Sequence, residues 1–422
     1  MRTARIRWMI AFSVAVAVAG PGYADGLIRD GIGAISMGRG GVNLGYADNG
    51  AIILDNPAGM SNIRGNNLFE IGVDTVICTL DYSDVDNPNA DASVNGYPLP
   101  MVGYVHRSPD SPWTWGIGAY APAGFGAGYD LVNPHTGPSV YKSFGALAKI
   151  LPGVSYEVND RLSIGGTFGL ALSHVELEGP FYLQTGPLAG TPTVLDLQTT
   201  GAAPTGSIGL QYKLTPATVL GVAYTEQTKF ISDGNASAQI GPLSSTFDAT
   251  TTLTWPRSLG IGVMHEFCCC SKLGFDVVWY DWSSAFNELP ITLRNPANPI
   301  VAGLLGPQLS DAFPMRWHDS VTYKVGYEWS PSDVLTWRTG YTFHNSPVPD
   351  ATLNPYLDGV LQHVVSAGVS RQVGASWLNL AYQYSWGPTR NVVDSEIVGD
   401  DFSNSSLRAD AHWIGVSVLR LY

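Results

Sequence analysis

Apolar and polar residues alternate one by one along most of the chain. In segment 320–329 the odd positions carry Val, Tyr or Trp, while the even positions are polar, charged or glycine. The same alternation recurs over 162–172, 335–343 and 378–386. A period of two residues is typical of a β-strand with one apolar face. The pattern therefore predicts an all-β chain.

Alternation alone also fits a soluble sandwich, because each strand of a sandwich buries one face. Two features favour a membrane barrel. The polar face is rich in Gly, Ser, Thr and isolated charges, whereas the apolar face carries Tyr and Trp near strand ends. This is the distribution of a barrel whose outside meets lipid and whose inside meets water or a ligand. The connections between strands also alternate in length.

Six short turns are expected, near residues 108–111, 159–160, 215–216, 268–271, 330–333 and 372–375. Seven long, polar outer loops are expected at 84–97, 124–142, 179–201, 231–250, 285–316, 345–359 and 387–405. These connections join fourteen strands, an even number with both ends on the short-turn side, as in outer-membrane barrels. Only a closed barrel pairs every backbone group of a sheet inside a bilayer. We therefore predict a 14-stranded antiparallel transmembrane β-barrel over residues 67–422, with an N-terminal hatch.

Residues 1–24 have the pattern of a signal peptide. A basic stretch with Arg2, Arg5 and Arg7 precedes an apolar run from Met9 to Ala19, and a small-x-small sequence follows. An uncleaved membrane anchor is the alternative, but the apolar run is shorter than the roughly 18 residues that span a bilayer. The sequence predicts export, with a mature chain that starts at Asp25.

Composition and charge exclude several classes of function. Only 14% of the residues are charged, the formal net charge is −13, and no block of Lys or Arg occurs. Nucleic-acid binding needs clustered cations, so it is excluded. The chain has neither a G-x-S-x-G nor an H-E-x-x-H motif, and its eight histidines are dispersed. We predict that the protein is not an enzyme. A barrel lipid hydrolase stays open as an alternative, because catalytic pairs can join only in space.

Residues 25–66 do not alternate and are rich in glycine. The stretch Gly38-Arg39-Gly40-Gly41 suggests a phosphate loop, but no alternating strand leads into it and no Lys-Ser/Thr follows. A compact hatch folded into the barrel mouth explains the glycines better, because they permit close backbone approaches.

This stretch, followed by Asp48 and by Asn56-Pro57-Ala58-Gly59, resembles the N-terminal hatch of the long-chain fatty acid transporter (FadL) family of outer-membrane proteins. Residues 152–165 are similar to the family's fourth strand, turn and fifth strand. Pro122-Ala123-Gly124 resembles the end of its third strand, and residues 346–350 resemble a late extracellular loop.

The resemblance implies passive uptake of hydrophobic small molecules across the bacterial outer membrane. Substrate would bind among outer loops, pass into the lumen, and leave sideways through a gap at a kink in the third strand, against which the hatch Asn-Pro-Ala packs. Family members resemble transporters of long-chain fatty acids, toluene or xylene, so both fatty acids and aromatic hydrocarbons stay open as substrates. Import and export also stay open.

Carried over by position, the hatch motif is Asn56, Pro57 and Ala58, and Gly124 is the candidate for the kink. Pro122 supports the kink, because proline removes a ladder hydrogen bond and is unusual in a central strand. The alternative for Pro122 is an ordinary strand end.

Three cations point inward by strand parity: Lys149, Lys324 and Arg338. They are the candidate partners for a substrate carboxylate, since charge-assisted hydrogen bonds to carboxylates are strong. The alternative is that they pair with the inward acids Asp74, Glu157 or Glu328 and only solvate the lumen.

No cofactor and no metal are expected. The adjacent Cys268, Cys269 and Cys270 lack the spacing that closes a tetrahedral metal site, and their role stays open. Acidic outer loops could bind Ca²⁺, but such residues are more often solvated. The expected partners are a hydrophobic small molecule, outer-membrane lipid and lipopolysaccharide, around a monomer. A receptor or adhesin barrel is the alternative function.

Overall fold

The structure, a computed structural model, describes residues 27–422 except 94–95, 185–187, 269, 358 and 400–401. The predicted signal peptide, residues 1–24, lies outside the described residues, and so does Cys269. No helix in the described part of the chain is both long enough and apolar enough to cross a membrane.

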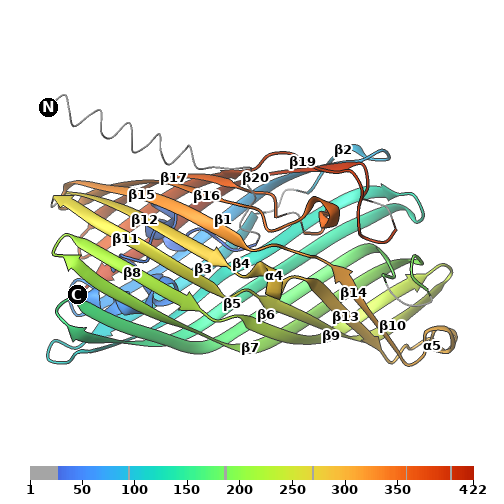
Figure 1. Ribbon diagram of the computed structural model, residues 1–422, viewed down its shortest axis with the longest axis horizontal. Helices are drawn as coiled ribbons and strands as arrows, with labels where there is room; N and C mark the ends of the chain where they lie inside the picture. Colours follow the sequence, from blue (N-terminus) through green and yellow to red (C-terminus); the bar gives the residue numbers. More distant parts are fainter. Residues whose placement is uncertain (1–26, 94–95, 185–187, 269, 358, 400–401) are drawn as a thin grey trace.

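The strands form one closed antiparallel barrel (Figure 1). Within the described residues, ten wall strands are single segments: β1 (Asn67–Ser83), β3 (Gly96–Arg107), β4 (Trp113–Asn133), β5 (Gly137–Asn159), β6 (Leu162–Tyr182), β7 (Pro192–Thr215), β16 (Leu335–His344), β17 (His363–Val373), β18 (Ser376–Trp386) and β20 (Ser405–Leu421).

Four more wall strands consist of two segments each, with a break in the middle of the wall. They are β8 (Thr218–Thr225) with β9 (Thr228–Ile240), β10 (Leu243–Trp255) with β11 (Ser258–Cys268), β12 (Ser271–Tyr280) with β13 (Glu288–Arg294), and β14 (Gln308–Pro314) with β15 (Ser320–Ser332). Pairing of β1 with β20, from Leu68↔Leu421 to Ser83↔Ser406, closes the barrel. The predicted 14-stranded antiparallel barrel is confirmed.

The remaining elements are short. At the outer end lie β2 (Pro88–Asp91), β19 (Arg390–Val392), α5 (Pro299–Leu305) and the 3₁₀ turn η2 (Asp350–Thr352), and α4 (Trp282–Ala285) fills one of the mid-wall breaks. The N-terminal segment contains α2 (Gly33–Gly38), α3 (Ile52–Asp55) and the 3₁₀ turn η1 (Pro57–Asn62).

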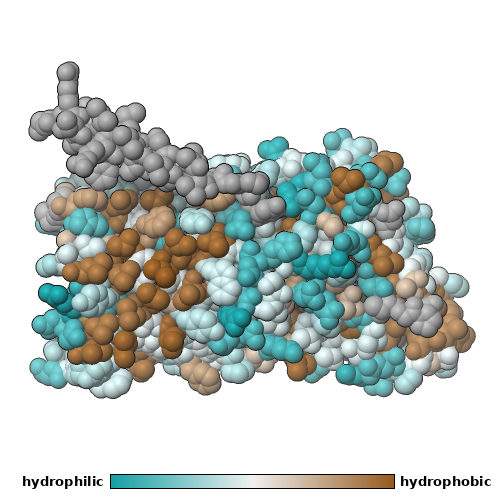
Figure 2. All heavy atoms as spheres, viewed as in Figure 1, coloured by the Kyte–Doolittle hydropathy of each residue, from teal (hydrophilic) through white to brown (hydrophobic). Residues whose placement is uncertain are grey.

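In the half of the barrel that ends in the short turns, the wall is apolar outside and polar inside. Ile71, Phe168 and Ile208 are exposed on the outer face, while Glu70 and Asp74 are buried on the inner face. Figure 2 shows apolar side chains gathered over this half, where β8, β11 and β12 run. This is the face that lipid requires.

In the outer half the alternation is reversed. On β9, Phe230 and Ala236 are buried inside, whereas Lys229 and Asp233 are exposed outside. Buried apolar residues from most of the wall, including Leu80 of β1 and Leu407 of β20, form one cluster that lines this half of the lumen. Apolar residues inside and polar residues outside follow the rule of soluble sheets, which indicates that water surrounds the barrel here.

Four of the predicted outer loops are wrong in extent because of this reversal. Residues 124–142 belong mostly to β4 and β5, 231–250 to β9 and β10, and 285–316 contain β13, α5 and β14. Of 179–201, only 183–191 connects strands. The outward residues of these segments are polar because they face water, and the sequence pattern resembles a loop for that reason.

The N-terminal segment lies inside the polar half of the lumen. Asp74 accepts a hydrogen bond from the Gly33 N–H at 2.8 Å, and Glu70 accepts one from the Gly50 N–H at 2.6 Å. Thr342 donates to the Gly40 carbonyl at 2.8 Å. Inward polar groups of the wall thus find partners in the backbone of the segment, as buried polar groups require.

Glycines permit this close fit at two positions in particular. Gly41 has φ +71°, and a Cβ there would lie 1.6 Å from the Asp30 carbonyl oxygen. On the wall, a Cβ at Gly340 would lie 2.3 Å from the Arg39 carbonyl carbon. Neither contact tolerates a side chain.

Candidate functional site

The third wall strand, β4, is kinked at Ala121 and Pro122. Its ladder with β5 runs through Tyr120↔Lys149 and resumes at Ala123↔Leu147, so two residues of β4 stand opposite one of β5. Such a bulge bends the strand. Of the two predicted kink residues, Pro122 lies in the bulge, whereas Gly124 is already back in the ladder, opposite Ala146.

Next to the kink, the wall is unpaired between β3 and β4. Their ladder extends only from Arg107↔Thr114 to Met101↔Tyr120. Beyond it, residues 96–100 of β3 pair with no wall strand except β1, and residues 123–133 of β4 pair with no described wall strand except β5. Farther out, the Ser93 N–H donates to the Gly128 carbonyl at 2.8 Å. Among the described residues, these bonds bound an opening in the wall.

Two prolines fix the β3 edge of this opening. The ladder of β3 with β1 runs without interruption through Pro98 and Pro100, so their nitrogen atoms face β4. Because proline has no N–H, β3 cannot donate to β4 there. The sequence analysis did not predict this unpaired edge. Two prolines two residues apart within one strand are the pattern that indicates it.

The ring of Tyr97 lies across the opening. By its register with Val76, Tyr97 points toward the lumen. Its ring nevertheless lies 5.8 Å from that of Phe144 on β5, and its hydroxyl would be 3.4 Å from a Cβ at Gly126 on β4. Phe144 also contacts His174, which shares its outward parity. Beyond the kink, β4 therefore lies inside the line of β3, and Tyr97 fills the space between the two edges.

The N-terminal segment closes the opening from the lumen. The Arg29 N–H donates to the Pro122 carbonyl, and the Gly124 N–H donates to the Leu27 carbonyl, both at 3.1 Å. The Arg29 guanidinium also donates to the Ala121 carbonyl at 3.0 Å and pairs with Asp74 of β1 at 2.5 Å. Arg29 therefore joins β1 to β4 behind the unpaired edge.

Asn56, Pro57 and Ala58 lie elsewhere, so the expected packing of this motif against the third strand is wrong. The Asn56 side chain donates to the carbonyls of Leu44, at 2.9 Å, and of Leu210 on β7, at 3.1 Å. Glycines 165 and 209 on β6 and β7 leave the room for Asn56 and Pro57. The motif docks where the wall lacks side chains, while the kink is contacted by residues 27–29.

A cavity of about 130 Å³ lies directly behind the kink. Pro122, Ala123 and Leu147 line it from the wall, Leu44 lines it from the N-terminal segment, and Trp255 lines it from β10. Two of the three predicted inward cations, Lys149 and Lys324, are also in its lining. The Lys324 Nζ donates to the Asp30 carbonyl at 2.6 Å.

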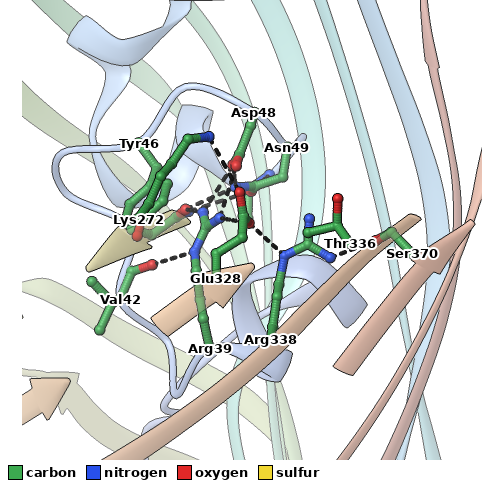
Figure 3. A network of polar contacts seen from close by, with 12 residues as sticks. Arg39, Val42, Tyr46, Asp48, Asn49, Lys272, Glu328, Thr336, Arg338 and Ser370 are labelled. Atoms are coloured by element: carbon green, nitrogen blue, oxygen red, sulfur yellow. Dashed lines mark hydrogen bonds and ion pairs between the residues drawn. The ribbon is translucent and has the colours of Figure 1, made fainter. Parts of the chain in front are cut away.

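Arg338, the third predicted cation, points inward but belongs to a different set of contacts (Figure 3). Its Nε donates to Glu328 at 2.7 Å, and Glu328 also accepts from Lys272 at 3.2 Å. Arg338 therefore pairs with an acid of the lumen, which is the alternative that the sequence left open for it.

Arg39, fully buried, links this set to the N-terminal segment. Its guanidinium donates to Asp48 at 2.8 and 2.9 Å, stacks over the Tyr46 ring at 3.6 Å, and lies 3.6 Å from Glu328. Burial alone would raise the pKa of the Asp48 carboxyl, but the Arg39 guanidinium lowers it below its ordinary value. Asp48 therefore stays ionised, and the pair anchors the segment to β15.

The described side chains include no group of three or more His, Cys, Asp or Glu residues that could hold a metal ion. At the outer end, the Asp84 carboxylate accepts from the Asn87 side chain at 3.0 Å and from the Asp86 N–H at 2.8 Å. These acidic residues are thus engaged in loop hydrogen bonds.

A family model described as "Outer membrane protein transport protein (OMPP1/FadL/TodX)" matches residues 18–418. No curated protein matches the chain. Solved structures do: a Pseudomonas aeruginosa FadL homologue has 16% sequence identity and a TM-score of 0.75, covering 94% of this chain and 99% of its own.

Two toluene transporters are also similar. Pseudomonas putida TodX has 22% identity and a TM-score of 0.74, and Ralstonia pickettii TbuX has 18% identity and a TM-score of 0.72. Each alignment covers 93% of this chain and 99% of the other. At these identities the likeness shows a shared fold.

Proposed function

Because the chain belongs to the OMPP1/FadL/TodX family of outer membrane transport proteins, we propose that it is a passive channel that takes up hydrophobic small molecules and releases them sideways into the membrane. The observation that carries this proposal is the unpaired edge between β3 and β4, beside a lumen cavity. A receptor or adhesin barrel needs no opening in its wall, and a closed ladder is the more stable arrangement.

The outer half of the lumen supplies the first part of the route. Its interior is apolar, and a smaller cavity of about 60 Å³, lined by Phe181, Leu183, Leu195 and Phe313, lies near the outer loops. A hydrophobic solute gains about 0.8 kcal/mol of binding free energy for each methylene that it buries there. From this interior the solute reaches the cavity behind the kink.

The opening lies at a depth where the wall faces lipid. Val73 and Ile77 on β1, and Ile150 and Leu172 next to the kink, are exposed apolar residues of the outer face. A hydrophobic solute that leaves between β3 and β4 therefore enters hydrocarbon without crossing the lipopolysaccharide layer or water. Inward transport follows from the concentration difference alone.

We propose that residues 25–66 act as the hatch and residues 67–422 as the channel, within one monomer. Residues 27–29 would be the part of the hatch that closes the exit, and Asn56, Pro57 and Ala58 the part that keeps it docked. Lipid and lipopolysaccharide would surround the barrel, and no catalytic role is proposed.

The substrate class is the finer question. The similar toluene transporters support a small aromatic hydrocarbon, and the inward Lys149 and Lys324 support a carboxylate such as a fatty acid. Arg338 is left out of the proposed ligand set because Glu328 already binds it.

Uptake by intact cells tests the proposal. The full chain is produced in a Gram-negative strain that lacks channels of this type, and initial rates are measured for labelled oleate and toluene. Faster uptake of either solute than in cells with the empty vector supports a channel. Rates equal to the vector control, with the barrel folded in the outer membrane, would favour a receptor instead.

The Arg29–Asp74 pair gives a prediction about the exit. Arg29→Met leaves Asp74 buried without a cation, which typically costs about 3–5 kcal/mol, so residues 27–29 should detach from the kink. Hydrogen exchange of the Arg29 and Gly124 amides, followed by mass spectrometry, should become at least about tenfold faster. Adding Asp74→Asn removes the unpaired charge and should restore part of the protection. Unchanged exchange in the single variant would exclude a closing role for Arg29.

A further inference from the structure

Lys149 is a buried cation to which the structure gives no partner. The residue is 8% exposed, and within the described part of the chain no oxygen lies at hydrogen-bonding distance from its Nζ. The other cations of the cavity are engaged: Arg29 binds Asp74, and Lys324 binds the Asp30 carbonyl. A buried charge without a partner is costly, and an arriving anion would remove that cost.

Each carboxylate that lines the cavity is engaged with another group through one oxygen, and among the described residues the buried Oδ1 atoms of Asp30 and Asp276 have no hydrogen-bond partner. Asp276 accepts from the Asn43 N–H at 2.7 Å and from the Leu44 N–H at 3.1 Å. Asp55 accepts from the Asn43 side chain at 2.5 Å, and Asp30 lies 3.4 Å from His344. These acids hold the hatch in place, and Lys149 stays available to a ligand.

The cavity has room for one ring. Its volume of about 130 Å³ is close to the roughly 150 Å³ of a cavity that binds benzene, although this cavity is open on one side and carries charged residues in its lining. A single ring fills it, whereas a long acyl chain would extend out of it.

One side of the cavity is aromatic. Trp255 and Tyr280 line it, both buried, and the Trp255 ring stands 6.4 Å from that of Trp282 and 6.2 Å from that of Phe286. An aromatic ligand gains offset or edge contacts on such a surface beyond its buried area. The Trp255 Nε1–H is buried and has no acceptor in the described part of the chain, so it is available to donate to a ligand oxygen.

We infer that the ligand of this cavity is a monocyclic aromatic carboxylate, with its ring against Trp255 and its carboxylate on Lys149. This inference rests on the proposed uptake function and specifies its substrate. It differs from a neutral hydrocarbon, which leaves Lys149 unpaired, and from a long-chain fatty acid, which has no ring to place against Trp255.

Binding to the detergent-purified full chain tests this inference. Titration calorimetry compares 4-methylbenzoate, toluene and oleate, of which the first two differ only by the carboxylate. A charge-assisted hydrogen bond contributes about 1.5–3 kcal/mol, so 4-methylbenzoate should bind roughly 10- to 100-fold more tightly than toluene. Lys149→Met should remove this advantage and leave toluene affinity within about twofold.

Matched variants separate binding from misfolding. Lys149→Arg keeps the charge and should keep the preference for the acid, and Lys229→Met, at an exposed lysine of β9, should bind like the unchanged chain. Equal affinity for toluene and 4-methylbenzoate, a preference that survives Lys149→Met, or tighter binding of oleate would each overturn the aromatic carboxylate. All three results leave the uptake function intact, because that function fails only if cells take up none of the three compounds faster than the vector control.

Discussion

Uptake should fall by at least about tenfold when Pro122 is deleted in a chain that also carries Pro98→Val and Pro100→Val, because a continuous ladder leaves no gap between strands. The deletion places Ala121 opposite Ala148 and leaves Ala123 opposite Leu147, so the bulge disappears without a change of register on either side. The two valines supply the N–H donors that β3 lacks along this edge. The measurement is the initial uptake rate of labelled toluene and 4-methylbenzoate by intact cells.

Two controls isolate the opening. Pro122→Ala keeps the bulge, in which two residues of β4 lie opposite one residue of β5. The double variant Pro98→Val with Pro100→Val also keeps it. The uptake rates of both variants should therefore stay within about twofold of the rate of the unchanged chain. The change in gel mobility between unheated and boiled samples reports whether each barrel is folded. A folded deletion variant with normal uptake would show that solutes leave by another path.

Arg39→Met should undock the hatch. The substitution removes the hydrogen-bonded cation of the partly buried Asp48, whereas Glu328 keeps Arg338 and Lys272. The cost should therefore lie below the roughly 3–5 kcal/mol that is typical of a fully buried pair. The barrel ladder does not depend on Arg39, so the wall should stay folded while residues 33–50 become mobile. Hydrogen exchange of peptides from this segment should increase, and peptides from β16 to β18 should stay protected.

The exposed pair Arg316–Glu396 provides the matched comparison. Arg316→Met removes a cation from a solvated ion pair, which should cost less than about 1 kcal/mol and leave the hatch protected. Adding Asp48→Asn to Arg39→Met should recover much of the lost protection, because Asp48 is then neutral and Glu328 keeps Arg338 and Lys272 as partners. Equal protection in Arg39→Met and Arg316→Met would show that hydrogen bonds alone hold the hatch.

Alternation of residues was sufficient to predict the membrane half of the barrel. Lipid outside and polar groups inside impose a period of two on each strand, so the strand number and the inward parity of Lys149, Lys324 and Arg338 follow from local sequence. Pro122 was a local signal of the same kind, because proline interrupts any ladder.

The outer half and the contents of the lumen were decided only by the tertiary structure. Whether an outward face meets lipid or water depends on its position along the barrel axis. The outward residues of segment 231–250 are polar because they face water, so the segment resembles a loop in sequence although it forms β9 and β10. Likewise, among the described residues Arg338 meets Glu328 while Lys149 meets no acid, because each contact depends on the register of neighbouring strands and on the position of the hatch. Arg29 meets Asp74 across 45 residues, a contact that no local pattern encodes.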